Sequence, residues 1–237
     1  MNRDARGLRI FAVVPAAGAG ARFGSGTEKQ YADLDGAPVL ARTLDRLATL
    51  TCERVFVVLS EADQNYERRI GKRDGVEVLR CGGATRADTV RNAVAAIAPK
   101  CAPHEWVLVH DAVRPCVPRE ALGRLVDELR DDAVGGLLAI PVADTLKRAD
   151  GERAINTEDR ESLWHAQTPQ MFRCSILTAA LSRNPHIAFT DEAQAVELLA
   201  AAGACAPPRL VRGSRANLKI TYAEDLALAA AIFKAGL

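Results

Sequence analysis

The stretch VVPAAGAGARFG, from Val13 to Gly24, joins a short apolar run to a cluster of glycines and alanines near the start of this chain. Arg22 follows the small residues, and Lys29 lies a little further on. Backbone N–H groups of a loop rich in glycine and alanine can approach phosphate oxygens closely, because no large side chain intervenes. The stretch therefore predicts a first strand followed by a loop that binds a polyphosphate, with two fixed cations beside it.

Two common phosphate-binding motifs do not fit this loop. The dinucleotide fingerprint G-x-G-x-x-G would begin at Gly18 and Gly20, but Phe23 stands at its third glycine position. The P-loop pattern needs Gly-Lys-Ser/Thr, whereas Lys29 is followed by Gln30. A dinucleotide-dependent oxidoreductase is therefore weakened and a P-loop NTPase is excluded. Small residues after a first strand can also serve only the close packing of a strand against a helix. Whether this loop binds phosphate therefore depends on the evidence from the other loops.

Beyond this loop, short apolar runs alternate with segments of helical spacing. The strand-like runs occupy residues 8–14, 54–59, 76–79, 106–110, 134–142 and 208–214. Helical spacing fits residues 39–50, 86–98, 119–133, 175–184, 191–203 and 222–236. This alternation is typical of an α/β fold with a mostly parallel, Rossmann-like sheet and helices on both faces. Ligands of such sheets bind beyond the carboxyl ends of the strands, where the first loop also lies.

One polar stretch breaks the alternation, between Asp144 and Arg160. Its Ala-Asp-Gly sequence in the middle indicates a hairpin turn. We expect a protruding β-arm at about residues 142–163 of a single domain spanning residues 1–237. An isolated hairpin is marginally stable in water, and pairing with a second copy of the chain would cover it. The arm therefore predicts a homodimer.

Composition narrows the classes of protein further. The 237 residues are 49% hydrophobic and carry a net charge of +1, which suits a large core and neither disorder nor nucleic-acid binding. The charged first residues and the short apolar run after them fit neither a signal peptide nor a membrane span. Six cysteines without a C-x-x-C pair suggest reduced, mostly buried thiols. We expect a soluble, cytoplasmic protein that does not bind membranes.

Seven motifs together resemble a known family. In order they are PAAGAGARFG with KQY, GGATRADTV, VHDAVRP, PVADTLK, WHAQTPQMF, TDEA and NLKIT. Their order and spacing resemble the 2-C-methyl-D-erythritol 4-phosphate cytidylyltransferases of non-mevalonate isoprenoid synthesis, from about residue 10 to the C-terminus. The resemblance implies transfer of CMP from MgCTP to 2-C-methyl-D-erythritol 4-phosphate, with release of pyrophosphate and formation of 4-diphosphocytidyl-2-C-methyl-D-erythritol.

The resemblance also implies the residues of the nucleotide side. Arg22 and Lys29 would stabilise the transition state at the α-phosphate, which is how phosphoryl transfer is generally accelerated. Thr89 would contact the cytosine with its hydroxyl, at a position where relatives usually carry serine. The implied nucleotide contacts are Ala16, Ala17, Gly18, Gly20, Gly82, Gly83, Thr89 and Asp111.

The acceptor side follows from the later motifs. Arg160 and Lys219 would orient the acceptor phosphate, with Arg160 reaching the partner's site in the dimer. Arg114 could be catalytic or could anchor its loop by an ion pair. The implied acceptor contacts are Asp111, Arg114, Thr145, Arg160, Thr168, Thr190 and Lys219.

Two features of the chemistry complete the hypothesis. A phosphate monoester, with a second pKa of about 6, is already nucleophilic near neutral pH, so His104, His110, His165 and His186 need no catalytic role. Mg²⁺ is expected, held mainly by the CTP phosphates, and Asp111 is the candidate protein ligand.

Some alternatives stay open at this point. A ribitol or related polyol phosphate cytidylyltransferase would share the nucleotide loops and differ around the acceptor. A dinucleotide-binding oxidoreductase survives only through the Gly-x-Gly fragment, and a catalytically silent nucleotide sensor survives in principle. Glu28, where relatives often have proline, is expected to point its carboxylate to solvent and away from the phosphates.

Overall fold

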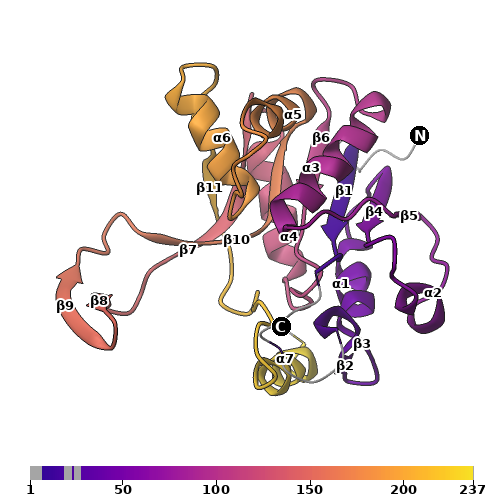
Figure 1. Cartoon of the computed structure of the whole chain (residues 1–237), viewed down its shortest axis with the longest axis horizontal. Coiled ribbons are helices and arrows are strands. Elements are labelled where there is room, and N and C mark those ends of the chain that lie inside the picture. Colours follow the sequence, from indigo (N-terminus) through magenta and orange to yellow (C-terminus); the bar gives the residue numbers. More distant parts are fainter. Residues whose placement is uncertain (1–6, 19–22, 24–27, 237) are drawn as a thin grey trace.

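The centre of this computed structural model, which describes residues 7–18, 23 and 28–236, is a seven-stranded sheet in the order β11-β7-β10-β6-β1-β4-β5 (Figure 1). The strands are β1 (Ile10–Pro15), β4 (Arg54–Val58), β5 (Val76–Leu79), β6 (Trp106–Val109), β7 (Gly135–Pro141), β10 (Trp164–Arg173) and β11 (Arg209–Arg212). Neighbouring strands pair in parallel except at β10, which runs antiparallel to both β6 and β7. The mostly parallel α/β sheet predicted from sequence is confirmed.

The sequence pattern did not predict β10. The first half of its sequence WHAQTPQMFR mixes apolar and polar residues, and Pro169 follows, which normally argues against a central strand. The strand accommodates the proline at an irregularity, because its register against β7 shifts between Ala166 and Gln170. After the shift, Met171 and Phe172 are fully buried. The local sequence pattern was therefore too weak to predict β10 as a strand, although β10 lies inside the sheet.

Helices cover both faces of the sheet. They are α1 (Val39–Leu47), α2 (Asn65–Arg69), α3 (Arg86–Ile97), α4 (Arg119–Leu129), α5 (Cys174–Arg183), α6 (Glu192–Ala201) and α7 (Asp225–Lys234). Six of them lie where helical spacing predicted them, and the short α2 was not predicted. Shorter pieces complete the fold: the 3-10 turns η1 (Lys29–Tyr31) and η2 (Ala98–Lys100), and the small strands β2 (Asp33–Leu34) and β3 (Ala37–Pro38).

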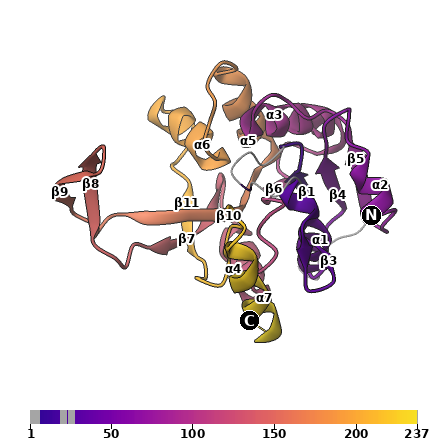
Figure 2. The same cartoon turned by 60° about the horizontal axis from the view of Figure 1, so that its bottom comes forward.

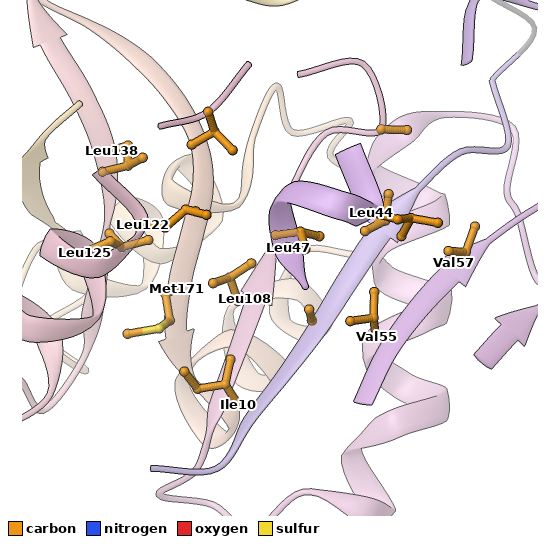
Figure 3. Close-up of a cluster of buried hydrophobic side chains, with 14 of the residues drawn as sticks. Ile10, Leu44, Leu47, Val55, Val57, Leu108, Leu122, Leu125, Leu138 and Met171 are labelled. Atoms are coloured by element: carbon orange, nitrogen blue, oxygen red, sulfur yellow. The ribbon is translucent and has the colours of Figure 1, made fainter. Parts of the chain in front are cut away.

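Alternating residues of β1 bury both faces of the sheet. Ile10 contributes to a core with α1 and α4, which includes Leu44, Leu47, Leu122 and Leu125 (Figure 3). The next residue along the strand, Phe11, faces the opposite core, under α3, α5 and α6. Because successive strand residues point to opposite faces, a continuous apolar run such as IFAVV fills two cores at once.

A third cluster holds the end of the first loop against α7. Phe23 is buried there with Leu34, Val113 and Ile220. Phe23 is the residue that stands where a dinucleotide fingerprint would need its third glycine. A buried phenylalanine therefore occupies this position, and it belongs to the core cluster beside α7.

The polar stretch forms the expected arm. Strands β8 (Leu146–Asp150) and β9 (Arg153–Glu158) pair as an antiparallel hairpin, and Gly151 in its turn has a φ of 56°. Figures 1 and 2 show the hairpin projecting well away from the sheet, at the far end of β7 and β10. Most of its side chains are exposed, and Ile155 is 63% exposed. The protruding β-arm is confirmed.

Two other expectations concern the cysteines and the membrane. All six cysteines lie in the described ranges and are free thiols, and three of them, Cys101, Cys116 and Cys174, are buried. The expectation of mostly buried thiols thus holds for half of them. Among residues 7–18, 23 and 28–236, no helix is both long enough and apolar enough to cross a bilayer.

Candidate active site

Two adjoining chambers lie at the loops that follow the carboxyl ends of β1 and β6. The first, of about 390 Å³, is lined by Ala16, Ala17, Gly18, Lys29, Gly83 and Thr89, among others, and we call it the nucleotide-side chamber because these residues are the nucleotide contacts that the resemblance implies. The acceptor-side chamber, of about 220 Å³, is lined by Arg114, Thr168, Thr190 and Asp191, among others. Both chambers share three wall residues, which are Arg86, Asp111 and Lys219.

Asp111 is the centre of this shared wall. Its side chain is buried, and Oδ1 lies 2.8 Å from Nε of Arg86 while Oδ2 lies 2.8 Å from Nζ of Lys219. Nε of Arg114 lies 3.7 Å from the same Oδ2. Burial alone would raise the pKa of Asp111, but these cations outweigh it and hold the pKa far below its ordinary value. The carboxylate therefore stays ionised between the chambers.

His110 is part of the structure that orients Asp111. Its Nε2 lies 3.1 Å from the carbonyl of Arg114, which can only accept, so Nε2 carries the proton. Its Nδ1 then accepts from the hydroxyl of Thr168, 3.1 Å away, and that hydroxyl accepts from the backbone N–H of Asp111 at 3.0 Å. Burial lowers the pKa of His110 to about 4. The imidazole is neutral and fully hydrogen-bonded, as a structural residue should be.

This network gives Thr168 a role that the sequence did not indicate. The residue lines the acceptor-side chamber, where the resemblance places it. Its hydroxyl, however, donates to His110 and accepts from Asp111, so only one lone pair remains for a ligand. Thr168 therefore holds the loop after β6 in place as well as facing the chamber.

Two glycines let the loop after β5 pack closely against its neighbours, Gly82 against Ala17 of the first loop and Gly83 against α3. A Cβ added to Gly82 would lie 2.4 Å from Cβ of Ala17 and 2.8 Å from the carbonyl oxygen of Leu59. A Cβ on Gly83 would lie 2.4 Å from Cβ of Asp88. Gly83 lines the nucleotide-side chamber, and Gly82 lies directly behind Ala17. Gly82 therefore lets this loop approach Ala17 and Leu59, and Gly83 lets it approach the first turn of α3.

Thr89 lines the nucleotide-side chamber, but its hydroxyl is already engaged. It donates to the carbonyl of Thr85 at 3.0 Å and accepts from the backbone N–H of Gly83 at 3.0 Å. Thr85 caps α3 in a capping box with Asp88, which fixes the helix N-terminus beside the chamber. The hydroxyl of Thr89 therefore shapes the loop, and it has one remaining lone pair for a base.

Lys29 enters the nucleotide-side chamber from η1, and its neighbours anchor that turn. Nε2 of Gln30 donates to the carbonyl of Ala16 at 3.1 Å, which ties η1 to the first loop. The hydroxyl of Tyr31 donates to Oδ2 of Asp63 at 2.8 Å in the protein interior. Burial, with Asp63 beside it, raises the pKa of Tyr31, so the phenol remains a donor. These contacts place Lys29 opposite the glycine-rich loop.

The structure describes only part of the first loop and of the segment that leads to Lys29. Gly20 and Arg22 lie outside the described residues. Gly18 lines the nucleotide-side chamber as expected. Glu28 is not among the residues that line the nucleotide-side chamber, in keeping with the expectation that it points away from the phosphates. It is only partly exposed to solvent, however, and accepts from Nδ2 of Asn65 at 3.4 Å. The contact turns its carboxylate toward α2.

Arg114 and Thr190 both line the acceptor-side chamber. Nη1 of Arg114 donates to the carbonyl of Asn217 at 2.7 Å, so this arginine joins the loop after β6 to the segment that carries Lys219. The backbone N–H of Thr190 donates to Oε1 of Gln194 at 2.8 Å. Arg114 therefore anchors its loop, through this hydrogen bond and its 3.7 Å ion pair with Asp111, and it also lines the chamber.

The structure does not bring Thr145 and Arg160 to either chamber of their own chain. Both are exposed on the segments that lead into and out of the arm (Figures 1 and 2). Nη1 of Arg160 donates to the backbone carbonyl of Ala143. Two residues expected at the acceptor phosphate thus lie apart from the rest of the site in a single chain.

Arg86 and Glu192 are site residues that the sequence reasoning missed. Nη1 and Nη2 of Arg86 donate to Oε1 and Oε2 of Glu192, at 2.7 and 3.1 Å, while its Nε donates to Asp111. Both belong to quoted motifs, GGATRADTV and TDEA. In the sequence, each reads as an ordinary charged residue in the first turn of a helix. Only the tertiary fold brings them together.

Asp111 is also the place where a hard cation fits. Within the described ranges, no three His, Cys, Asp or Glu side chains converge as a protein cage for a metal would require. An ionised, buried carboxylate shared by both chambers instead suits a cation carried largely by substrate phosphates. One oxygen of Asp111, now paired with Lys219, could serve as its protein ligand.

Comparison with known proteins gives one consistent result. The family model described as 2-C-methyl-D-erythritol 4-phosphate cytidylyltransferase matches residues 10–235. The chain is 51% identical over 234 residues to the protein of that name from Thiobacillus denitrificans, covering 95% of this chain and 97% of the relative. It is 52% identical over 227 residues to the one from Laribacter hongkongensis, covering 94% and 96%.

Solved structures agree with the sequence matches. A crystal structure of 4-diphosphocytidyl-2C-methyl-D-erythritol synthase superposes with a TM-score of 0.83 at 38% identity, covering 95% of this chain and 98% of that one. The 2-C-methyl-D-erythritol 4-phosphate cytidylyltransferase of Francisella tularensis gives a TM-score of 0.78 at 30% identity, covering 94% and 99%. The likeness thus extends over nearly the whole of each chain.

Proposed function

Because this chain belongs to the 2-C-methyl-D-erythritol 4-phosphate cytidylyltransferase family, we propose a division of labour between its two chambers. The enzyme transfers CMP from CTP to 2-C-methyl-D-erythritol 4-phosphate in the non-mevalonate route to isoprenoids. In our proposal the nucleotide-side chamber holds CTP and the acceptor-side chamber holds the polyol phosphate. The observation that carries it is the wall of Arg86, Asp111 and Lys219 that the chambers share.

The reaction is a phosphoryl substitution at the α-phosphorus of CTP. An oxygen of the acceptor phosphate forms a bond to that phosphorus, and the bond to the bridging oxygen of the β-phosphate breaks, so pyrophosphate leaves. The attacking phosphate is already an anion near neutral pH, so no side chain has to remove a proton. His110, neutral and hydrogen-bonded at both ring nitrogens, is not needed as a base.

Positioned cations supply the catalysis. Lys29 and Arg22 would face the developing charge at the α-phosphate, and Lys219 would face the acceptor phosphate across the shared wall. Phosphoryl transfer depends mainly on such positioning and charge stabilisation. In the ligand-free chain Lys219 is paired with Asp111 at 2.8 Å, so it is held beside the place where the two phosphates would meet.

A divalent cation, which we take to be Mg²⁺, would enter with the triphosphate and lower its charge. Asp111 is the residue that would hold it. The carboxylate is suited to this because its pKa stays far below neutral pH even though it is buried. The chain's own part is to keep that oxygen ionised, oriented by the backbone contact to Thr168 and by Arg86.

We also propose that the active unit is a homodimer. Residues 1–237 would act as one nucleotidyltransferase domain, and the arm of β8 and β9 would pair with the arm of a second copy. Thr145 and Arg160 would then complete the partner's acceptor-side chamber. This is supported by their distance from both chambers of their own chain and by exposed apolar side chains on and near the arm, namely Ile155, Leu163 and Trp164.

One experiment tests the activity and the acceptor together. Purified protein is incubated with CTP, Mg²⁺ and either 2-C-methyl-D-erythritol 4-phosphate or ribitol phosphate, and pyrophosphate release is measured. We expect rapid release with the first acceptor and little with the second. Preference for ribitol phosphate would overturn the acceptor assignment and leave the nucleotide chemistry in place.

A further inference from the structure

Glu192 is a buried carboxylate that touches neither chamber. It is 2% exposed and lies in the first turn of α6, where both of its oxygens are bound by the guanidinium of Arg86. It is not among the residues that line the nucleotide-side or the acceptor-side chamber. A buried ion pair generally adds little stability over well-packed apolar residues, so the presence of this pair calls for a reason beyond folding.

The geometry of Arg86 suggests what the pair does. An arginine presents a planar fork that can take both oxygens of one carboxylate. Glu192 takes one N–H from each Nη atom and so fixes the orientation of the guanidinium. In this orientation Arg86 makes a single hydrogen bond to Asp111, from Nε to Oδ1 at 2.8 Å. Oδ2 of Asp111 is left for Lys219, at 2.8 Å. Without Glu192, the fork of Arg86 could turn and cover both oxygens of Asp111.

We propose that Glu192 is a positioning residue for the transfer reaction, acting through Arg86 to keep Oδ2 of Asp111 free of the guanidinium and paired with Lys219 in the shared wall. The inference rests on the proposed function, in which CTP and the acceptor phosphate meet beside that wall. Glu192 does not contact substrate. It holds the guanidinium in an orientation that leaves Asp111 and Lys219 available at the place where the phosphates meet.

Four variants test this in the full-length enzyme. They are Glu192→Gln, Arg86→Gln, the double variant of both, and Glu197→Gln as a matched control, because Glu197 is on the same helix but exposed. Glu192→Gln keeps the shape of the side chain and removes its charge. We expect it to lower kcat roughly tenfold or more while the KM values for CTP and acceptor change less than about threefold. Glu197→Gln should leave kcat unchanged.

The double variant asks whether Glu192 acts through Arg86. Once Arg86 is glutamine there is no fork to restrain, so removing the charge of Glu192 should add nothing, and the double variant should match Arg86→Gln. If the two effects multiply instead, Glu192 does not act through Arg86. An unchanged kcat in Glu192→Gln, with only a lower Tm, would likewise overturn the proposal and leave a purely structural ion pair.

Crystal structures of the wild type and Glu192→Gln separate this inference from the proposed function. If the wild type fails to turn over 2-C-methyl-D-erythritol 4-phosphate, the proposed function falls, and the structures alone decide the role of Glu192. Bidentate pairing of Arg86 with Asp111 in the variant supports the inference. An Arg86 that keeps its single Nε contact to Oδ1 overturns it.

Discussion

At the scale of single residues, the main feature of the site is one carboxylate, that of Asp111, which several cationic side chains contact. Asp111 lies within 4 Å of three cationic side chains, those of Arg86, Arg114 and Lys219. Each of these contacts stabilises the ionised form, which burial by itself would disfavour. A ligand phosphate that enters either chamber competes with Asp111 for the same cations. The residue therefore holds the cations ready in the free enzyme and can release them to substrate.

The first prediction at this scale concerns Lys29. Replacing it with alanine should lower kcat by roughly a hundredfold, because a positioned charge that acts on the transition state is lost. Steady-state rates of pyrophosphate release over a range of CTP concentrations measure it. Lys72→Ala, a lysine outside both chambers, is the control and should keep the wild-type kcat. A Lys29→Ala enzyme with normal kcat and only a higher KM for CTP would show that Lys29 serves ground-state binding.

The second prediction concerns His110 and the pH dependence of stability. Its pKa is lowered to about 4 by burial, whereas an unfolded chain gives about 6.5, so the unfolded state binds the proton more readily. The contribution of neutral His110 is complete above pH 6.5 and is lost as pH falls toward 4. The free energy of unfolding should therefore decrease over this window, by up to about 3 kcal/mol.

His110→Gln isolates that contribution, since Glu192, whose pKa is raised by burial, acts in the opposite direction. Urea unfolding of both proteins at several pH values between 4.5 and about 7 gives the comparison. The difference between wild type and variant should shrink as the pH falls. A constant difference across the window would mean that His110 does not titrate there.

At this scale the sequence predicted some roles and could not predict others. The histidines needed no catalytic role because a phosphate dianion is a sufficient nucleophile, and His110 proves to be buried and neutral. Arg86 and Glu192 could not be paired in advance, because they come from the first turns of two helices that lie 106 residues apart in the sequence and meet only in the folded chain. Nothing in the local pattern around either residue distinguishes it from a solvated helix end.

At the scale of elements, the loop after β5 depends on the loop after β1. Gly82→Ala would push a methyl group to 2.4 Å from Cβ of Ala17. We expect a loss of stability of about 1–3 kcal/mol from overpacking, together with a higher KM for CTP because the nucleotide loops separate. Thermal unfolding and CTP titration of the variant measure the two effects.

Gly123→Ala is the matched control for this substitution. Gly123 lies within α4, where an added Cβ would meet nothing within 4 Å. Alanine there should stabilise the protein by up to about 1 kcal/mol and leave the KM for CTP unchanged. Equal effects of the two substitutions would mean that the contact between Gly82 and Ala17 does not shape the nucleotide-side chamber.

At the scale of elements, helices and strands could be predicted where their own residues show a clear hydrophobic pattern. The IFAVV run of β1 buries both faces and reads as a central strand without further context. β10 carries no such signal, because its first half mixes apolar and polar residues and Pro169 is tolerated only through the register shift against β7. β10 lies between β6 and β7, whose apolar sequences predict strands clearly. Pairing with these two neighbours, and not its own sequence pattern, makes β10 a strand.

At the scale of the whole molecule, two of the residues expected at the acceptor phosphate lie apart from the two chambers of their own chain. The shared wall and the nucleotide-side chamber are built within one chain, whereas Thr145 and Arg160 lie out by the arm. The sequence could indicate the arm from its polar composition and turn residues, but single-chain geometry cannot supply its partner. In the proposed dimer, each site would combine Lys29 of one chain with Arg160 of the other.

That arrangement predicts complementation between two inactive variants. Arg160→Ala and Lys29→Ala homodimers each carry a defect in both sites, whereas a mixed dimer has one site in which both residues are wild type. Random exchange places about half of the dimers in the mixed form, so activity should recover to roughly a quarter of the wild-type value per site. Pyrophosphate release is measured before and after subunit exchange, with mixing confirmed by an affinity tag on one variant. If mixing is confirmed and activity does not return, Arg160 serves its own chain or no site at all, and the arm has another purpose.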